Sequence, residues 1–358
     1  KGNRNCKQLE LVRLSNSKEK TAIKSNGLYV ITGGMGSLGR IFATYITNKK
    51  AKVILLGRKK LNKSQTDFVE SLPNATYMIC DITNRQKVQN AVSKIKKEYG
   101  QINGIIHTAG ITRDSLIQLK TAEEAKSVFA PKMEGVKNLD EVCKNEPLDF
   151  MMLFSSIVSE LGNIGQSDYT AANAYLNNYA LYREQERLLG NRKGKTYSIG
   201  WGFWQDGGMR LQEEQIGYLD TQWGMKPIPT DSGLELFETI LATASQNLLV
   251  AYGDSKRMST IITNRLVEKK KVENLVEQNS KNIKEKLLDK LHLLIADLLK
   301  LDKDRIDRDK DLAAYGVDSI LLTELNSELN AYYEIALLPS VFYNNTTIES
   351  LADHLLEE

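Results

Sequence analysis

A glycine-rich sequence directly after a short apolar segment constrains the fold of this chain more than any other feature. Residues 34–39 read Gly-Met-Gly-Ser-Leu-Gly and fit the pattern G-x-G-x-x-G. The apolar segment Leu28–Thr32 predicts a buried strand before this pattern, and a helical pattern follows it. In such a strand–turn–helix, glycines let the backbone approach a pyrophosphate, and the helix N-terminus supplies N–H groups. We therefore predict a dinucleotide site; the alternative is a tight turn without a ligand. The expected contacts here are Gly33, Gly36, Ser37, Leu38 and Gly39.

Strand-like and helix-like segments alternate along residues 27–252, which is typical of a parallel α/β sheet. Short, strongly apolar segments predict strands at Leu28–Thr32, Lys52–Leu56, Thr76–Cys80, Gly104–Thr108, Phe150–Ser155 and Thr196–Trp201. Helical periodicity predicts helices at Arg40–Lys49, Arg85–Tyr99, Ala122–Cys143, Ala171–Leu189 and Asp231–Ala244. Residues 202–230 are rich in Gly, Trp and Pro and would suit a mobile lid. We expect a Rossmann-type, doubly wound parallel sheet.

The C-terminal part of the chain differs from the rest in charge and in periodicity. Residues 282–358 hold 8 basic and 16 acidic side chains, a balance of −8, whereas residues 1–281 hold 40 and 29, a balance of +11. Helices are expected from Ile283 to Leu298, from about Ser319 to Tyr332, and from the capping-box pattern Thr346–Glu349 onward. We expect a small α-helical bundle over residues 282–358, after a Lys-rich linker at residues 266–281.

The composition excludes several classes of protein. With 41% apolar and 26% charged residues, the chain of 358 residues is not disordered. Its three cysteines (Cys6, Cys80 and Cys143) form no CxxC pair, which indicates a reducing compartment and argues against a metal site such as zinc. The lysines are scattered, so we expect no nucleic-acid partner. The sequence has neither an apolar run of about 18 residues nor a signal peptide, so we expect a cytoplasmic protein with no membrane partner.

The residues after the second predicted strand indicate the cofactor. An NAD site usually has Asp or Glu there to bind the ribose hydroxyls, whereas this strand ends in Gly57-Arg58. A guanidinium suits a 2′-phosphate, which favours NADP over NAD; the alternative is that Arg58 is a solvated surface residue. We expect Asp81 to accept a hydrogen bond from the adenine and His107 to be structural. The further expected cofactor contacts follow the third and fourth strands: Asp81, Ile82, Ala109 and Gly110.

Residues suited to proton transfer follow the fifth predicted strand. Ser155 and Ser156 end this strand, and Tyr169 and Asn173 are spaced i, i+4 at the start of the next helix, so both project from one helical face. The carboxyl ends of parallel strands line the ligand crevice. Because the ordinary pKa of Tyr is about 10, a catalytic Tyr169 needs a nearby cation and a donated hydrogen bond.

These motifs closely resemble the ketoreductase domain of modular polyketide synthases, which belongs to the short-chain dehydrogenase/reductase superfamily. The resemblance covers about residues 27–252 and rests on Thr32–Gly39, His107–Gly110, Phe154–Ser156, Gly165–Asn173 and Trp201-Gly202. Ordinary short-chain enzymes carry Tyr-x-x-x-Lys, whereas position 173 here is Asn. The polyketide ketoreductases exchange that Lys and Asn, and Lys132 matches their lysine motif.

The resemblance implies the catalytic roles. The family's catalytic Ser stands thirteen residues before the Tyr, which selects Ser156. Tyr169 then protonates the nascent alkoxide, Ser156 hydrogen-bonds the ketone oxygen, Lys132 favours tyrosinate and binds ribose, and Asn173 orders the site. With hydride from NADPH, a carrier-bound β-ketoacyl thioester becomes a β-hydroxyacyl thioester.

The resemblance also bears on stereochemistry. The family's product classes differ at a Leu-Asp-Asp motif and at a Trp eight residues before the Tyr. Here the first reads Thr112-Arg113-Asp114 and the second is Leu161. We therefore expect the D-β-hydroxyl, with Asp114 and Leu161 as stereocontrol residues. The segments 113–115 and 148–150 look like those of synthases that use free-standing acyltransferases.

Residues 315–320, Tyr-Gly-Val-Asp-Ser-Ile, resemble the attachment site of acyl carrier proteins. The resemblance implies that a phosphopantetheinyl transferase attaches 4′-phosphopantetheine to Ser319, at a helix N-terminus that favours a phosphodiester. Acidic side chains such as Glu324 and Glu328 would face basic partner enzymes. The alternative is an unmodified helix cap.

We weigh three functions for the chain. The leading one is a ketoreductase–carrier didomain (ketoreductase 27–265) of a polyketide or hybrid synthase, with the neighbouring synthase domains as partners. The second is a fatty-acid-type ketoreductase, and the third is a catalytically silent ketoreductase scaffold beside a working carrier. Complete modular ketoreductases carry a truncated structural half, of which residues 1–26 hold one possible strand, Leu9–Leu14. We expect the chain to belong to a larger polypeptide, or that half to be supplied separately.

Overall fold

The computed structural model describes residues 9–12, 23–208, 213–243, 246–317, 319–333, 337 and 341–356. The chain divides into two compact units, residues 1–260 and 261–358, which we describe separately. Cys6 lies outside the described residues, and Cys80 and Cys143 are buried free thiols.

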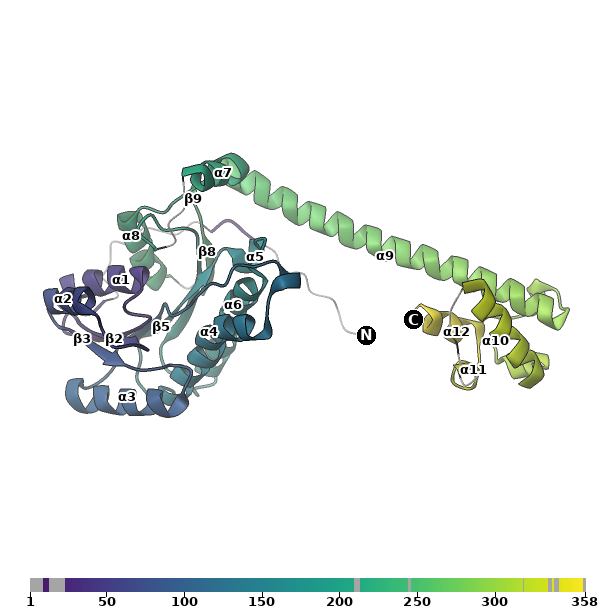
Figure 1. Cartoon of the computed structure of the whole chain (residues 1–358), viewed down its shortest axis with the longest axis horizontal. Coiled ribbons are helices and arrows are strands. Elements are labelled where there is room, and N and C mark those ends of the chain that lie inside the picture. Colours follow the sequence, from purple (N-terminus) through teal and green to yellow (C-terminus); the bar gives the residue numbers. More distant parts are fainter. Residues whose placement is uncertain are drawn as a thin grey trace. The chain divides into compact units, whose positions relative to one another are not determined.

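The larger unit is built on a seven-stranded sheet in the order β3-β2-β1-β4-β5-β6-β8 (Figure 1). Every neighbouring pair is parallel. The strands are β1 Leu28–Thr32, β2 Lys52–Gly57, β3 Ala75–Ile79, β4 Gly104–His107, β5 Phe150–Ser156, β6 Lys195–Trp201 and β8 Asn247–Val250. The central strands β1, β4 and β5 are buried along their whole length, as expected for a parallel sheet covered on both faces.

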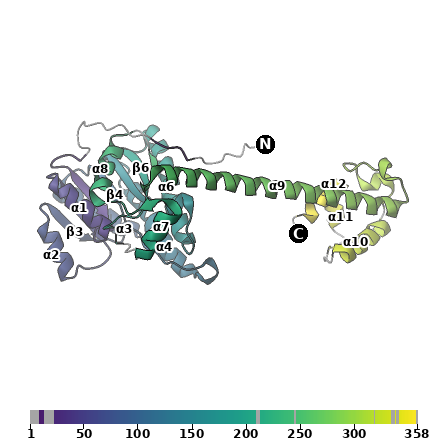
Figure 2. The same cartoon turned by 90° about the horizontal axis from the view of Figure 1, so that it is seen from above.

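Helices cover both faces of this sheet (Figure 2). Tyr29 and Ile31 of β1 pack with α1 (Ser37–Asn48) and α8 (Thr230–Leu241) on one face. The alternate residues, Leu28 and Val30, pack on the opposite face. The helices of that second face are α3 Arg85–Tyr99, α4 Ala122–Val142 and α6 Ser167–Leu188. The predicted doubly wound sheet is therefore confirmed.

Several elements differ from the sequence prediction. Helix α2 (Lys63–Ser71) and strand β8 were not expected. The region expected to form a lid contains helix α7 (Glu213–Trp223) and strand β7 (Met225–Lys226), which pairs with β9 (Tyr252–Gly253). Residues 9–12 form no strand, so the strand predicted over Leu9–Leu14 is wrong for its described part; residues 13–14 lie outside the description.

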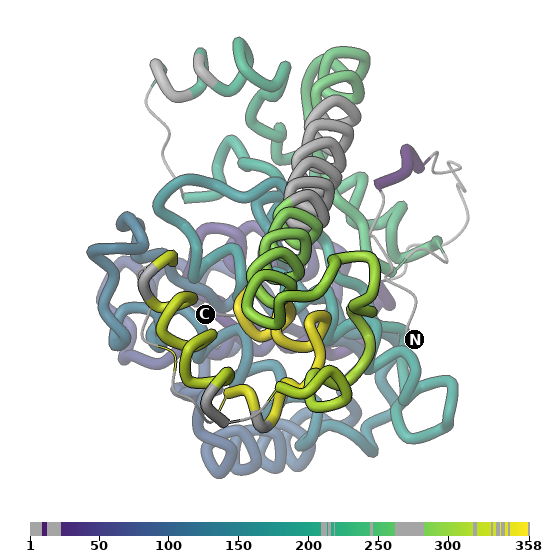
Figure 3. Tube along the Cα trace, turned by 90° about the vertical axis from the view of Figure 1, so that its right-hand side faces the viewer, coloured from purple at the N-terminus to yellow at the C-terminus, as the bar shows by residue number. Residues whose placement is uncertain are grey.

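The smaller unit is helical, as predicted. Its helices are α10 Ser319–Tyr333, α11 Val341–Asn344, α12 Ile348–Leu355 and the C-terminal part of α9 (Ser255–Leu299). Figure 3 shows α10 and α12 beside the end of α9. They share a core of leucine, isoleucine and phenylalanine side chains that includes Leu291, Leu329 and Leu351. Residues 266–281, where we expected a linker, lie within α9.

The last helix begins one residue later than its predicted capping box. Thr347, not Thr346, is the N-cap: its side chain accepts a hydrogen bond from the Ser350 backbone N–H, and Ser350 Oγ accepts from Thr347 N–H. With this start, Ile348, Leu351 and Ala352 face the core. Helix α12 therefore begins where its apolar face can be buried.

Candidate functional site

The glycine-rich loop after β1 is shaped by positions that admit no side chain. Gly33 has a φ of +66°, and a Cβ there would lie 2.8 Å from the Ala109 Cα. A Cβ at Gly39 would lie 2.6 Å from the Gly33 carbonyl oxygen. Helix α1 starts at Ser37 behind Gly36, and no side chain caps it. The loop thus lets the backbone come close to a pyrophosphate, and the uncapped N-terminus of α1 offers free N–H groups to it.

A pocket of about 370 Å³ adjoins this loop. Gly33, Met35 and Gly36 line one side, and residues 57–60 line another, so that Arg58 borders the pocket. None of the described lining residues is acidic. The fit to a negatively charged group comes from Arg58 and its two neighbouring lysines.

The other expected cofactor contacts lie at the same edge of the sheet, after β3 and β4. Asp81 Oδ1 accepts hydrogen bonds from the Thr83 backbone N–H at 3.1 Å and from its hydroxyl at 2.8 Å. Ile82 is buried, and Gly110 lies over Lys132, whose Cε is 2.9 Å from a Cβ placed at that glycine. The segment Ala109-Gly110 therefore lies between the glycine-rich loop and Lys132, close to both.

Lys132, Ser156, Tyr169 and Asn173 come together from three elements: α4, β5 and α6. All four are buried, with exposed fractions of 9% or less. The Lys132 ammonium donates a hydrogen bond to the Phe154 carbonyl at 2.9 Å and lies 5.8 Å from the centre of the Tyr169 ring. Asn173 Nδ2 donates to the Tyr169 carbonyl at 2.7 Å. A cation and a phenol are thus held side by side in a site shielded from water.

The two adjacent serines have different environments. Ser155 Oγ donates a hydrogen bond to the Asn173 carbonyl at 3.1 Å, which fixes β5 to α6. Ser156 instead interacts with the side chain of Tyr169 and helps to lower the pKa of that phenol. This placement favours Ser156 over Ser155 as the group next to the reacting oxygen.

Electrostatics favour a neutral phenol at Tyr169. Burial raises its pKa, the charge of Asp114 adds to the rise, and the side chains of Asn173 and Ser156 oppose it. The phenol therefore keeps its proton at neutral pH and can donate it.

His107 is fully buried beside Thr32, with 2.8 Å between Nδ1 and Oγ1, and burial lowers its pKa to about 3. His107 is neutral, in keeping with a structural role.

Burial lowers the pKa of Lys132 to about 7 from its ordinary value of 10.5. Between these two values the unfolded chain binds one more proton than the folded chain, so the free energy of unfolding rises with pH. Compared with Lys132→Met, the unaltered protein should gain up to about 1.4 kcal/mol per pH unit in this window. Denaturant unfolding at several pH values measures this difference, and Lys137→Met, an exposed change on the same helix, is the control. Parallel stability curves for the Lys132→Met variant and the unaltered protein would contradict a lowered pKa of the buried Lys132.

The expected stereocontrol residues lie beside this cluster. Asp114 Oδ2 accepts a hydrogen bond from Gln166 Nε2 at 2.8 Å. Leu161 packs against the apolar cluster that contains Tyr169 and Ala172. Gln166 was not singled out from the sequence, because its partner Asp114 lies in a distant loop.

Ser319 is the first residue of α10. Gly316 before it has a φ of +85°, so the chain turns sharply into the helix. The side chain of Ser319 and all of Asp318 lie outside the described structure. The backbone position matches the expected start of a helix.

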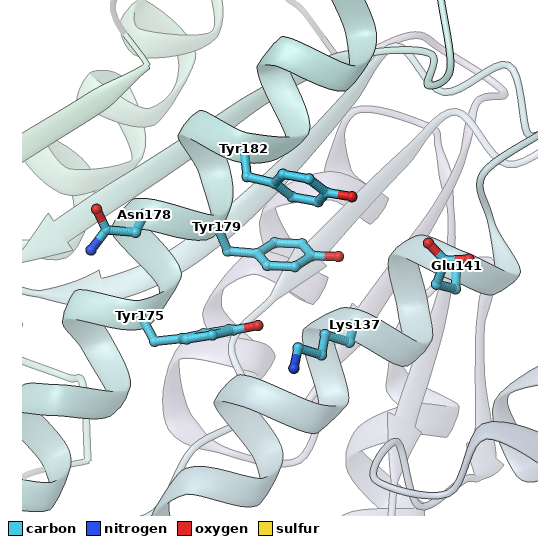
Figure 4. A pocket seen from close by; sticks show the side chains of 6 residues that line it. All are labelled: Lys137, Glu141, Tyr175, Asn178, Tyr179 and Tyr182. Carbon is cyan, nitrogen blue, oxygen red and sulfur yellow. The ribbon is translucent and has the colours of Figure 1, made fainter.

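A second pocket, of about 470 Å³, lies between α4 and α6 (Figure 4). Three tyrosines of α6 (Tyr175, Tyr179 and Tyr182) line it together with Lys137 and Glu141 of α4. None of the expected catalytic residues lines this pocket.

No helix in the described part of the chain is long and apolar enough to cross a membrane.

Comparison with protein families gives two matches. The family model described as KR domain matches residues 27–206, and the one described as phosphopantetheine attachment site matches residues 289–355. Polyketide synthase PksN of Bacillus subtilis (strain 168) is 38% identical over 94% of this chain. PksL of the same organism is 32% identical over 93%. The chain spans only 6% and 8% of these two relatives.

Solved structures resemble the larger unit. A ketoreductase domain from the bacillaene assembly line has a TM-score of 0.65 and 37% identity, over 66% of this chain and 58% of its own. An N-terminal ketoreductase from the macrolactin assembly line has a TM-score of 0.61 and 35% identity, over 68% and 48% of the two chains.

Proposed function

Because this chain belongs to the KR domain family and also carries a phosphopantetheine attachment domain, we propose that it reduces a β-ketoacyl thioester with NADPH. The predicted resemblance to polyketide synthases is confirmed by the Bacillus relatives. The two domains imply use of a nicotinamide cofactor and attachment of 4′-phosphopantetheine. The boundaries we propose are 27–265 for the ketoreductase and 282–358 for the carrier.

The observation that carries this proposal is the buried cluster of Lys132, Ser156, Tyr169 and Asn173 beside the glycine-rich loop. When bound, the nicotinamide supplies the hydride that reduces the ketone carbon. Ser156 Oγ–H donates a hydrogen bond to the ketone oxygen, and Tyr169 gives its phenolic proton to that oxygen as the alcohol forms. The Lys132 ammonium, 5.8 Å from the Tyr169 ring centre, stabilises the phenolate left behind. Asn173 holds the Tyr169 backbone through its 2.7 Å hydrogen bond.

The glycine positions fit the tight loop of a dinucleotide site, because a side chain at Gly33 would collide with the Ala109 backbone and one at Gly39 with the Gly33 carbonyl. We assign the pyrophosphate to residues 33–39, the 2′-phosphate to Arg58 and the adenine to Asp81 and Ile82. Ala109 and Gly110 then lie along the cofactor as it approaches Lys132. The D-β-hydroxyl product, with Asp114 and Leu161 as stereocontrol residues, belongs to the same proposal.

The cofactor assignment makes a prediction about Arg58. We expect NADPH to be preferred over NADH by about 100-fold in kcat/KM, because a guanidinium–phosphate contact contributes on the order of 1.5–3 kcal/mol. Arg58→Ala should raise the KM for NADPH about 10- to 100-fold and leave the KM for NADH unchanged. Steady-state kinetics with both cofactors measures this. The control is Lys52→Ala, which removes a cation at the opposite end of the same strand. Equal rates with NADPH and NADH in the unaltered chain would contradict the assignment.

We further propose that Ser319 carries the phosphopantetheine arm, attached by a phosphopantetheinyl transferase. The carrier then delivers thioester substrates to enzymes of the same synthase. A silent scaffold would bind cofactor and accept the arm without reducing any ketone, so a turnover assay separates it from the proposed reductase. A fatty-acid-type enzyme would differ in the length of the acyl chain that it accepts.

A further inference from the structure

We propose that Lys120 and Asp168 form a positioning pair that locks the loop between β4 and α4 onto the start of α6. This ion pair keeps Tyr169 and Asp114 at a fixed distance and orientation to each other during the reaction. This inference rests on the proposed function, because that relation matters only where Tyr169 acts on a substrate.

The pair is buried and charged. Lys120 Nζ lies 3.0 Å from Asp168 Oδ2, and the two side chains are only 5% and 2% exposed. Lys120 precedes the N-cap of α4, and Asp168 is the second residue of α6. Displacing the loop would separate Lys120 from Asp168, and a buried charge without its partner is very unfavourable. The loop therefore has one strongly preferred position.

Both members of the pair reach the neighbours of the expected catalytic groups. Lys120 Nζ also donates a hydrogen bond to the carbonyl of Arg113, the residue before Asp114. Asp168 Oδ1 accepts one from the Tyr169 backbone N–H at 2.8 Å. The ammonium and the carboxylate thus connect the backbone next to Asp114 with the backbone of Tyr169.

Two neutral hydrogen bonds join the same segments. Gln166 Nε2 donates to Asp114 Oδ2 at 2.8 Å, and the Ser115 backbone N–H donates to the Gly165 carbonyl at 2.9 Å. Gln166 is itself 8% exposed. With the ion pair, these contacts fix the loop at several points along its length, so Asp114 cannot shift independently of the start of α6.

Fixed spacing between loop and helix affects both rate and product. The face of the ketone that meets the hydride depends on how the substrate lies between Tyr169 and the loop carrying Asp114. A displacement of about 1 Å in such a site costs about 100-fold in rate. Loosening the loop should therefore slow the chemical step and admit the opposite orientation of the ketone.

The test uses Asp168→Asn and Lys120→Met in the full chain, with NADPH and a β-ketoacyl-pantetheine thioester. We expect kcat to fall at least about tenfold and the minor hydroxyl enantiomer to rise at least about tenfold, with NADPH affinity unchanged. Lys120→Arg keeps the charge and should retain the original product ratio. The control is Glu146→Gln, which removes the carboxylate from a 2.6 Å ion pair with Lys96, in which the Glu146 side chain is 8% exposed, and should change neither kcat nor product ratio.

The double variant Lys120→Met/Asp168→Asn leaves no unpaired charge. It replaces a single variant in the test if that variant does not fold. Because the two residues act as one unit, it should give the same product mixture as either single variant. Variants that bind NADPH and match Glu146→Gln in kcat and product ratio would overturn the proposal.

Amide hydrogen exchange separates this inference from the proposed function. In Asp168→Asn, residues 111–121 should exchange at least about tenfold faster than in Glu146→Gln, whether or not the chain reduces a ketone. Equal exchange in the two variants would overturn the positioning pair. An unaltered chain that reduces no β-ketoacyl thioester would instead refute the proposed function. The exchange result would then still decide whether Lys120 and Asp168 hold the loop in place.

Discussion

Tyr169→Phe should lower kcat for ketone reduction by about 10³-fold or more, while NADPH still binds. The substitution removes the phenolic proton and little else, because the ring stays in its apolar surroundings of Val128, Ile157 and Ala172. Water is a poor substitute donor, since Tyr169 is only 9% exposed and Lys132 only 3%. Turnover followed by cofactor absorbance, with a fluorescence titration for NADPH affinity, measures the two effects separately.

Tyr175→Phe is the matched control for this substitution, because it removes a phenol from the same helix in the pocket of Figure 4. We expect it to retain full turnover. Undiminished turnover in Tyr169→Phe would remove this residue from the mechanism. Parallel loss of NADPH binding and turnover would instead mean that Tyr169 shapes the cofactor site.

Ser319→Ala should abolish loading of the carrier. With a phosphopantetheinyl transferase and coenzyme A, the unaltered chain should gain the mass of one phosphopantetheine, and the variant none, because the alanine offers no hydroxyl for the phosphodiester. Intact-mass spectrometry measures the gain. Ser327→Ala, an exposed serine on the same helix α10, is the control and should load fully. If Ser319→Ala gains the same mass as the unaltered chain, the arm is attached elsewhere.

The sheet could be predicted from the sequence because its central strands are buried on both faces and therefore read as short, continuous apolar segments. Helix α2 could not, because none of its residues is buried and no apolar periodicity marks it. A capping box between Asn62 and Gln65 defines its start instead. Strand β8 has only four residues, Asn247–Val250, and is recognised by its pairing with β6.

The residues of the candidate site likewise differ in whether they could be predicted from the sequence. Ser156, Tyr169 and Asn173 stand in motifs with fixed spacing, so they could be nominated from the sequence. The contact between Lys120 and Asp168 could not, since the two residues are far apart in the chain and only the folded loop brings them within 3.0 Å. The burial that lowers the pKa of Lys132 to about 7 also depends on packing between α4, β5 and α6.

The most direct test of the central claim follows the hydride itself. NADPH in which both hydrogens on the reactive carbon of the nicotinamide are deuterium is incubated with the chain and a β-ketoacyl-pantetheine thioester, and the product is analysed by chiral chromatography and mass spectrometry. We predict one deuterium at the β-carbon of a single hydroxyacyl enantiomer, the D form, at a rate that Tyr169→Phe abolishes. An unreduced ketone, from a chain that binds NADPH and accepts phosphopantetheine on Ser319, would contradict the account and identify a silent scaffold.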